Sequence, residues 1–170
     1  CDEAQEATQS SSVYDWYRGS ISASYMPLWW NNENSGSDRW SGLFNCIFSC
    51  NEALKYLEDP TLETDYEEAQ RNQMIAQAYA LRAYSYLQLI KRWGGVPVLR
   101  EALERDHDYS KDKRGSFAQC VDFILESCDK ALAADDALQW PQRLLSYSNP
   151  ELSRAAIWAV KSQAVLYAAS

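Results

Sequence analysis

Hydrophobic residues recur at helical spacing most strongly between residues 74 and 99. The steps from one to the next are three or four residues, which places their side chains on one face of a helix. These residues are Ala76, Ala80, Ala83, Leu87 and Ile90. A second apolar set widens this face: Ile75, Tyr79, Tyr86 and Leu89. A helix with so much apolar surface has to be packed on several sides, so we expect it at the centre of its domain.

The residues that flank this helix predict where it begins and ends. Gly94 and Gly95 can adopt the positive φ that closes many helices, and Pro97 prevents the helix from continuing. Carboxylates are concentrated between Glu63 and Glu68, where they complement the positive end of the helix dipole. We therefore expect the central helix to begin near Glu63 and to end before Gly94.

Three further helices follow from the same spacing. One is expected from Arg39 to Glu58, after Asp38 as its N-cap. A second begins at the capping-box pair Ser116 and Gln119. The last runs to the end of the chain and is capped either by Asn149–Pro150 or by Ser153.

A weaker pattern predicts another helix, from Val13 to Tyr25. About five helices joined by loops, with small residues where they meet, indicate an all-α fold of antiparallel helical pairs of the tetratricopeptide-like type. No clean 34-residue period appears, so the sequence alone does not establish a repeat. The charged connector from 98 to 115 is expected to be solvated.

Composition limits the classes of function. The chain has 170 residues, enough for one domain with its own core, and a net charge of −8. A protein this acidic has no basic stripe for phosphates, so we do not expect nucleic-acid binding as a main function. The sequence contains no run of about 18 apolar residues, so it predicts no membrane-spanning helix.

The central helix and the turn after it carry a specific motif. Its residues are Leu81, Arg82, Ala83, Tyr84, Tyr86, Trp93, Gly94, Gly95 and Pro97. This motif resembles the hallmark segment of the SusD/RagB family, surface lipoproteins of Bacteroidetes-type bacteria that capture nutrients for an outer-membrane transporter. The segments Trp40 to Asn51 and Arg154 to Tyr167 resemble other helices of that family more loosely.

The resemblance implies a fold, a place and a partner. The motif residues would be structural, in a SusD-like N-terminal helical region that packs against a SusC-like TonB-dependent barrel in the outer membrane. The protein would be lipid-anchored at the cell surface. The resemblance covers nearly all of this chain but only about the N-terminal third of a usual member, so we expect this chain to be the N-terminal part of such a protein without its usual C-terminal part.

The first residue is a cysteine, and its thiol is expected to carry lipid. A mature chain that starts at Cys1 is what remains after a lipoprotein signal peptide is removed. Residues 1–12 would then be a tether, and residues 13–170 the helical domain. The alternative is a chain that happens to begin at a cysteine.

The other four cysteines fall in pairs on two predicted helices. Cys46 and Cys50 are four residues apart, and Cys120 and Cys128 are eight apart. We expect these thiols to be buried. The sequence leaves open whether a disulfide joins the two helices. Since there is no C-x-x-C and His107 is the only histidine, no zinc-ligand spacing exists, and we expect no metal and no cofactor.

A loop before the second helix has the composition of a sugar-binding surface. The apolar faces of sugar rings stack on aromatic side chains, while their hydroxyl groups need hydrogen-bond donors and acceptors. The candidate ligand-binding residues are Trp29, Trp30, Asn31, Asn32, Arg39 and Trp40. The alternative is that the tryptophans cover the scaffold and the asparagines make turns.

Catalysis is not expected. The sequence contains no G-x-S-x-G, no P-loop and no Cys–His pairing, and no two carboxylates stand out as a catalytic pair. We expect a surface lipoprotein that binds glycan for import through its transporter. The alternatives are a peptide-binding member of the same family and a helical-repeat adaptor that binds proteins and no nutrient.

Overall fold

The computed structural model describes residues 18–20, 39–61, 66–104, 106–133 and 152–169. The chain divides into two compact units, Cys1–Gly42 and Leu43–Ser170. In the described residues the regular elements are helices: α2 (Arg39–Leu57), α3 (Glu68–Trp93), the 3-10 helix η2 (Tyr109–Lys111), α4 (Phe117–Ala133) and α5 (Arg154–Ala169). The predicted all-α fold of tetratricopeptide-like helical pairs is confirmed.

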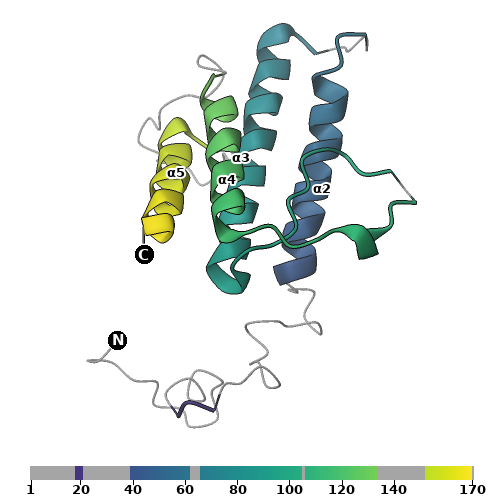
Figure 1. The fold of residues 1–170 in the computed structure, drawn as a ribbon. Coiled ribbons are helices and arrows are strands. Elements are labelled where there is room, and N and C mark those ends of the chain that lie inside the picture. The colour runs from purple at the N-terminus through teal and green to yellow at the C-terminus, as the bar shows by residue number, and fades with distance from the viewer. Residues whose placement is uncertain (1–17, 21–38, 62–65, 105, 134–151, 170) are drawn as a thin grey trace. The chain divides into compact units, whose positions relative to one another are not determined.

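α3 is the central helix of the second unit. It packs against α4 and α5 and is joined to α2 by side-chain hydrogen bonds, and successive helices run antiparallel (Figure 1). The residues predicted to line its apolar face are all buried: Ala76, Ala80, Ala83, Leu87 and Ile90. Arg82 and Ser85 are also buried on this helix, although both are polar.

The ends of α3 differ in part from the prediction. The helix begins at Glu68 and not near Glu63, because Glu67 has an extended backbone with φ −63° and ψ 151°. At the other end Gly94 has φ +67°, and its N–H donates to the carbonyl of Ile90 at 3.1 Å. A positive φ of this kind is what glycine adopts without steric cost.

Gly95 is needed for a different reason. Its φ is not positive, but a Cβ atom there would lie 2.1 Å from the carbonyl oxygen of Gly115. The two segments therefore approach so closely that no side chain fits. Gly115 N–H donates to the carbonyl of Val96 at 3.0 Å and fixes this approach.

Two of the predicted helix caps are present. At the start of α4, Ser116 N–H donates to Gln119 Oε1 at 2.8 Å, and Gln119 N–H donates to Ser116 Oγ at 3.2 Å. At the start of α5, Ala156 N–H donates to Ser153 Oγ at 3.3 Å, which selects Ser153 as the cap. The predicted N-cap Asp38 lies outside the described residues.

The helix predicted from Val13 to Tyr25 is wrong at its middle. Residues 18–20, the part of that segment that the structure describes, form a turn, and Gly19 has φ +66°. An α-helix cannot continue through a residue with this backbone conformation.

The cysteines in the described residues are free thiols, so the disulfide alternative is not realised there. Cys50, Cys120 and Cys128 are buried, as expected, and Cys46 is half-buried. No described helix is long and apolar enough to cross a lipid bilayer.

Candidate functional site

A buried arginine joins three helices and one loop. Arg82 of α3 is 3% exposed. Its Nη1 donates to Asn51 Oδ1 of α2 at 2.8 Å and to the carbonyl of Arg100 at 3.3 Å. Its Nε and Nη2 donate to Ser127 Oγ of α4 at 3.3 and 3.2 Å. One side chain thus connects α2, α3, α4 and the connector that follows α3.

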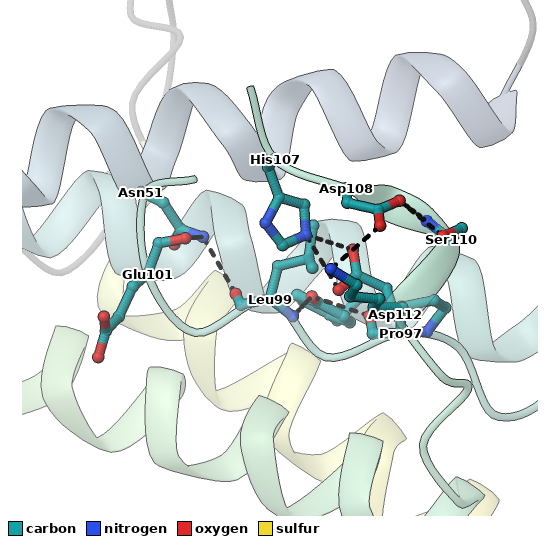
Figure 2. A network of polar contacts seen from close by, with 10 residues as sticks. Asn51, Pro97, Leu99, Glu101, His107, Asp108, Ser110 and Asp112 are labelled. Carbon is teal, nitrogen blue, oxygen red and sulfur yellow. Dashed lines mark hydrogen bonds and ion pairs between the residues drawn. The ribbon is translucent and has the colours of Figure 1, made fainter. Parts of the chain in front are cut away.

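Asn51 extends this network to the connector backbone. While its Oδ1 accepts from Arg82, its Nδ2 donates to the carbonyl of Leu99 at 3.0 Å and to that of Glu101 at 3.1 Å. Figure 2 shows the Asn51 side chain pointing toward the carbonyl of Leu99. All the polar atoms of this amide group are used, and the connector is held against α2 over residues 99–101.

Aromatic rings enclose the guanidinium group. Its central carbon lies 4.8 Å from the ring centroid of Tyr79 and 4.7 Å from that of Phe123. A cation at this distance from an aromatic face is stabilised by the ring quadrupole. The ring of Tyr86 meets Phe123 edge to face at 5.1 Å. Its hydroxyl accepts from Leu99 N–H at 2.7 Å and donates to the carbonyl of Pro97 at 3.2 Å.

The positive charge of Arg82 is stabilised without an ion pair in the described residues. Burial lowers its pKa, because a charged group is costly to remove from water. In the part of the chain that the structure describes, no carboxylate forms an ion pair with it; the guanidinium is held by an amide, a hydroxyl and a carbonyl. Its cationic form is therefore maintained by hydrogen bonds and rings.

A polar cleft of about 540 Å³ opens above this arginine. Its wall contains charged and aromatic side chains from α2, α3, α4 and the connector, among them Lys55, Glu58, Tyr79, Arg82, Arg100, Phe123, Glu126 and Lys130. The cleft thus offers cations, carboxylates and ring faces to a small polar ligand. Several of these side chains already form hydrogen bonds or ion pairs with one another.

Two pairs of side chains in this cleft form short hydrogen bonds. Tyr79 Oη donates to Glu58 Oε1 at 2.6 Å, and burial raises the pKa of Tyr79 to about 12. Arg100 Nη1 lies 2.7 Å from Glu126 Oε2, and this hydrogen bond lowers the pKa of the Glu126 carboxyl. A ligand that entered the cleft would have to replace contacts of this kind, and this cost would make its binding free energy less favourable.

A second polar cluster lies in the connector. His107 Nε2 is 2.9 Å from Asp112 Oδ2, and Ser110 Oγ donates to Asp108 Oδ1 at 2.6 Å (Figure 2). The ring of His107 also meets Tyr109 edge to face at 5.0 Å. These contacts shape the loop around η2. In the described residues no group of three or more His, Cys, Asp or Glu side chains is placed to hold a metal ion.

The loop predicted to bind sugar lies outside the described residues, except for its last two members. Trp29, Trp30, Asn31 and Asn32 fall in the segment 21–38, and Arg39 and Trp40 form the first turn of α2. Trp40 is half-buried. Whether these residues lie together therefore stays a prediction.

The motif residues occupy different places on α3. Arg82, Ala83 and Tyr86 are buried, whereas Leu81 and Tyr84 are 40% and 44% exposed. The polar partners of Arg82 were not predicted, but a signal for them exists. Asn51 lies between Ile47 and Leu54 on the apolar face of α2, and Ser127 lies between Ile124 and Ala131 on that of α4. A polar residue inside an apolar stripe indicates a buried hydrogen bond.

Comparison with known proteins identifies the family. Residues 2–164 match the model of a SusD-like family described as starch-binding and associating with the outer membrane. The chain belongs to this family, and the resemblance carried by the central motif is confirmed. A SusD-like protein of Formosa agariphila is 30% identical over 94 residues, which are 55% of this chain and 17% of that protein.

Solved structures share the fold. Surface glycan-binding protein A of Bacteroides fluxus is 22% identical with a TM-score of 0.64, over 78% of this chain and 26% of its own. Surface glycan-binding protein A of Bacteroides thetaiotaomicron, solved with laminarihexaose, is 22% identical with a TM-score of 0.62, over 78% and 25%. This chain therefore spans about a quarter of the length of these structures.

Proposed function

We propose that this chain is the helical region of a surface protein that binds glycan and delivers it to a TonB-dependent outer-membrane transporter. The observation that carries the proposal is the family match over residues 2–164, with its description as starch-binding and outer-membrane-associated. The family description supports a starch-like ligand, and the likeness to a fold solved with laminarihexaose supports a glycan of that kind as the alternative. The lipid expected on Cys1 would hold the protein at the membrane.

In this proposal the residues that hold the helices together and the residues that bind the ligand lie in different parts of the chain. The buried network of Arg82, Asn51 and Ser127 fixes α2, α3 and α4 relative to one another. Arg39 and Trp40, the last two candidate residues, are the first two residues of α2. Trp29 and Trp30 would stack on the sugar rings, and Asn31 and Asn32 would bind hydroxyl groups.

Affinity electrophoresis of the full-length protein tests the ligand. Gels that contain laminarin or starch should retard the protein, and the double variant Trp29→Ala/Trp30→Ala should migrate as it does in a gel without polysaccharide. Trp158→Ala on α5 is the matched control, because this indole is 48% exposed and lies in another element. Equal retardation of the double variant would reject the loop as the binding site.

A separate experiment tests the partner and the anchor. Solubilised outer membranes should yield a complex of this protein with a TonB-dependent barrel, and mass spectrometry should find acyl chains on Cys1. Recovery of the protein alone and without lipid would contradict the transport role. If no polysaccharide retards the protein, the peptide-binding or adaptor alternatives take the place of glycan binding.

A further inference from the structure

The polar cleft above Arg82 has a floor with an unused hydrogen-bond donor. The floor consists of the most buried lining residues, each at most 5% exposed: Asn51, Leu54, Tyr79, Arg82 and Phe123. A guanidinium group has five N–H donors. Within the described residues, Ser127 Oγ accepts from two of them, and Asn51 Oδ1 and the carbonyl of Arg100 accept from one each. The second N–H of Arg82 Nη2 has no acceptor there.

Two cations in the wall of this cleft share one carboxylate. Arg100 Nη1 lies 2.7 Å from Glu126 Oε2, and Lys130 Nζ lies 3.3 Å from Glu126 Oε1. The guanidinium groups of Arg82 and Arg100 lie over the same ring, 4.7 and 4.8 Å from the centroid of Phe123. Positive charge is therefore concentrated around Phe123, and in the described part of the chain Glu126 is its one carboxylate ion-pair partner.

These charges determine which class of ligand would gain by entering. A neutral ligand would only replace existing contacts, whereas an anion would also give Arg82 the counter-charge that it lacks among the described residues. Glu58 and Glu101 also line the cleft, and neither has an ion pair in the region that the structure describes. These two carboxylates would repel a second negative charge, but they can accept hydrogen bonds from hydroxyl groups.

We propose that this cleft binds a sugar acid with a single carboxylate. The carboxylate accepts the remaining N–H of Arg82 and is attracted by Arg100 and Lys130, while the hydroxyl groups donate to Glu58 and Glu101. The cleft volume of about 540 Å³ is within the range of small-molecule sites. The site uses none of the residues of the aromatic loop, so it is independent of the proposed glycan contacts at Trp29 and Trp30.

Isothermal titration calorimetry of the full-length protein with D-glucuronate tests the site. One glucuronate should bind to each protein, because the net charge of −8 disfavours non-specific binding of anions elsewhere on this chain. D-glucose has the same ring without the carboxylate, and it should bind at least about 10-fold more weakly, since hydrogen bonds to charged groups contribute more than neutral ones. Laminarin, the probe for the aromatic loop, should not compete with glucuronate.

Two wall variants should change the affinity in opposite directions. Glu126→Gln releases Arg100 and Lys130 from their carboxylate, so glucuronate should bind about 5-fold more tightly. Lys130→Gln removes one of the attracting cations and should weaken binding by about 5-fold. Lys161→Gln on α5 is the matched control: this lysine is also paired with a carboxylate, that of Asp129, but it does not line the cleft and should leave the affinity unchanged.

A second measurement needs no substitution in the cleft. In full-length protein made with isotope-labelled arginine, the Nε–H resonance of Arg82 should shift when glucuronate is added and should stay in place with glucose. Equal affinities for glucuronate and glucose, displacement of glucuronate by laminarin, or an unchanged affinity in both wall variants would overturn the proposal. Failure of the polysaccharide gels to retard the protein would reject glycan binding by the loop and would leave this result as it stands.

Discussion

The network around Arg82 makes a quantitative prediction for Arg82→Met. Methionine keeps most of the length and the apolar contacts with Tyr79 and Phe123, but it donates no hydrogen bond. Two buried acceptors then lose their partner: Asn51 Oδ1, on a residue 3% exposed, and Ser127 Oγ, on a residue 0% exposed. The variant therefore separates hydrogen bonding from packing.

The expected loss follows from these two acceptors. An unpaired buried polar group costs about 1–3 kcal/mol, so the pair costs about 2–6 kcal/mol. Removing the guanidinium also removes the cost of burying its charge, which offsets part of this loss. We expect the free energy of unfolding to fall by about 2–4 kcal/mol.

Urea unfolding measures this change. For an m-value of about 2 kcal/mol/M, the midpoint should move down by roughly 1–2 M. Hydrogen exchange should also become faster at residues 98–101, because Arg82 no longer supports Asn51 and the carbonyl of Arg100. A midpoint equal to or above that of the unchanged protein would refute the reasoning, since the network would then be no better than an apolar core.

A double variant controls for the source of the loss. Ser127→Ala in the Arg82→Met background removes one of the orphaned groups, so it should restore about 1 kcal/mol. In the unchanged protein the same substitution removes a partner of Arg82 and should be destabilising. Opposite signs in the two backgrounds assign the effect to the hydrogen bonds.

Three further predictions concern other parts of the scaffold. Gly95→Ala places a Cβ 2.1 Å from the carbonyl oxygen of Gly115, so it should cost about 2–3 kcal/mol and lower Tm by roughly 5–10 °C in a calorimetric scan. Ser116→Ala removes one half of the α4 capping box and should cost about 1 kcal/mol by urea unfolding. The alkylation rate of Cys46 should fall as pH drops through about 6, because only the thiolate reacts. Cys50→Ala removes the neighbouring thiol that lowers the pKa of Cys46 most, so it should move the midpoint up toward about 8.5.

Each of these has a control in the same chain. Gly42→Ala in α2 meets no atom within 4 Å and should be neutral or stabilising by about 0.5–1 kcal/mol. Ser49→Ala on the exposed face of α2 should change stability by less than about 0.5 kcal/mol. Cys128, whose pKa is raised to about 12 by burial, should stay unlabelled in the folded protein. Labelling of Cys128 at the rate of Cys46 would contradict the pKa argument.

The sequence was sufficient where structure depends on near neighbours. The apolar face of α3 and the paired caps Ser116 and Gln119 involve residues within a few turns of one another, and the structure contains them. The end of α3 at Gly94 was predictable for the same reason. Its beginning was not, because Glu67 and Glu68 both suit the first turn of a helix, and the sequence does not show which residue is the first helical one.

The sequence was insufficient where partners come from different helices. Arg82 meets Asn51 and Ser127 only because α2 and α4 pack on the same part of α3, and no local pattern specifies which polar residues will face one another. The charged connector was expected to be solvated, and its side chains Arg100 and Glu101 are exposed. Its backbone is nevertheless tied to Asn51, a contact that charge patterning does not reveal.

The connector after α3 is fastened at both of its ends. Asn51 holds it at Leu99 and Glu101, while Arg114 donates to the carbonyls of Gly95 at 2.7 Å and Trp93 at 2.6 Å. A segment closed in this way can change length without moving the helices, since each doubling of a loop costs only about 0.6 kcal/mol. Residues 102–113 are thus a position where relatives can acquire insertions, and where an epitope or a new binding loop can be grafted, while the helical core stays as it is.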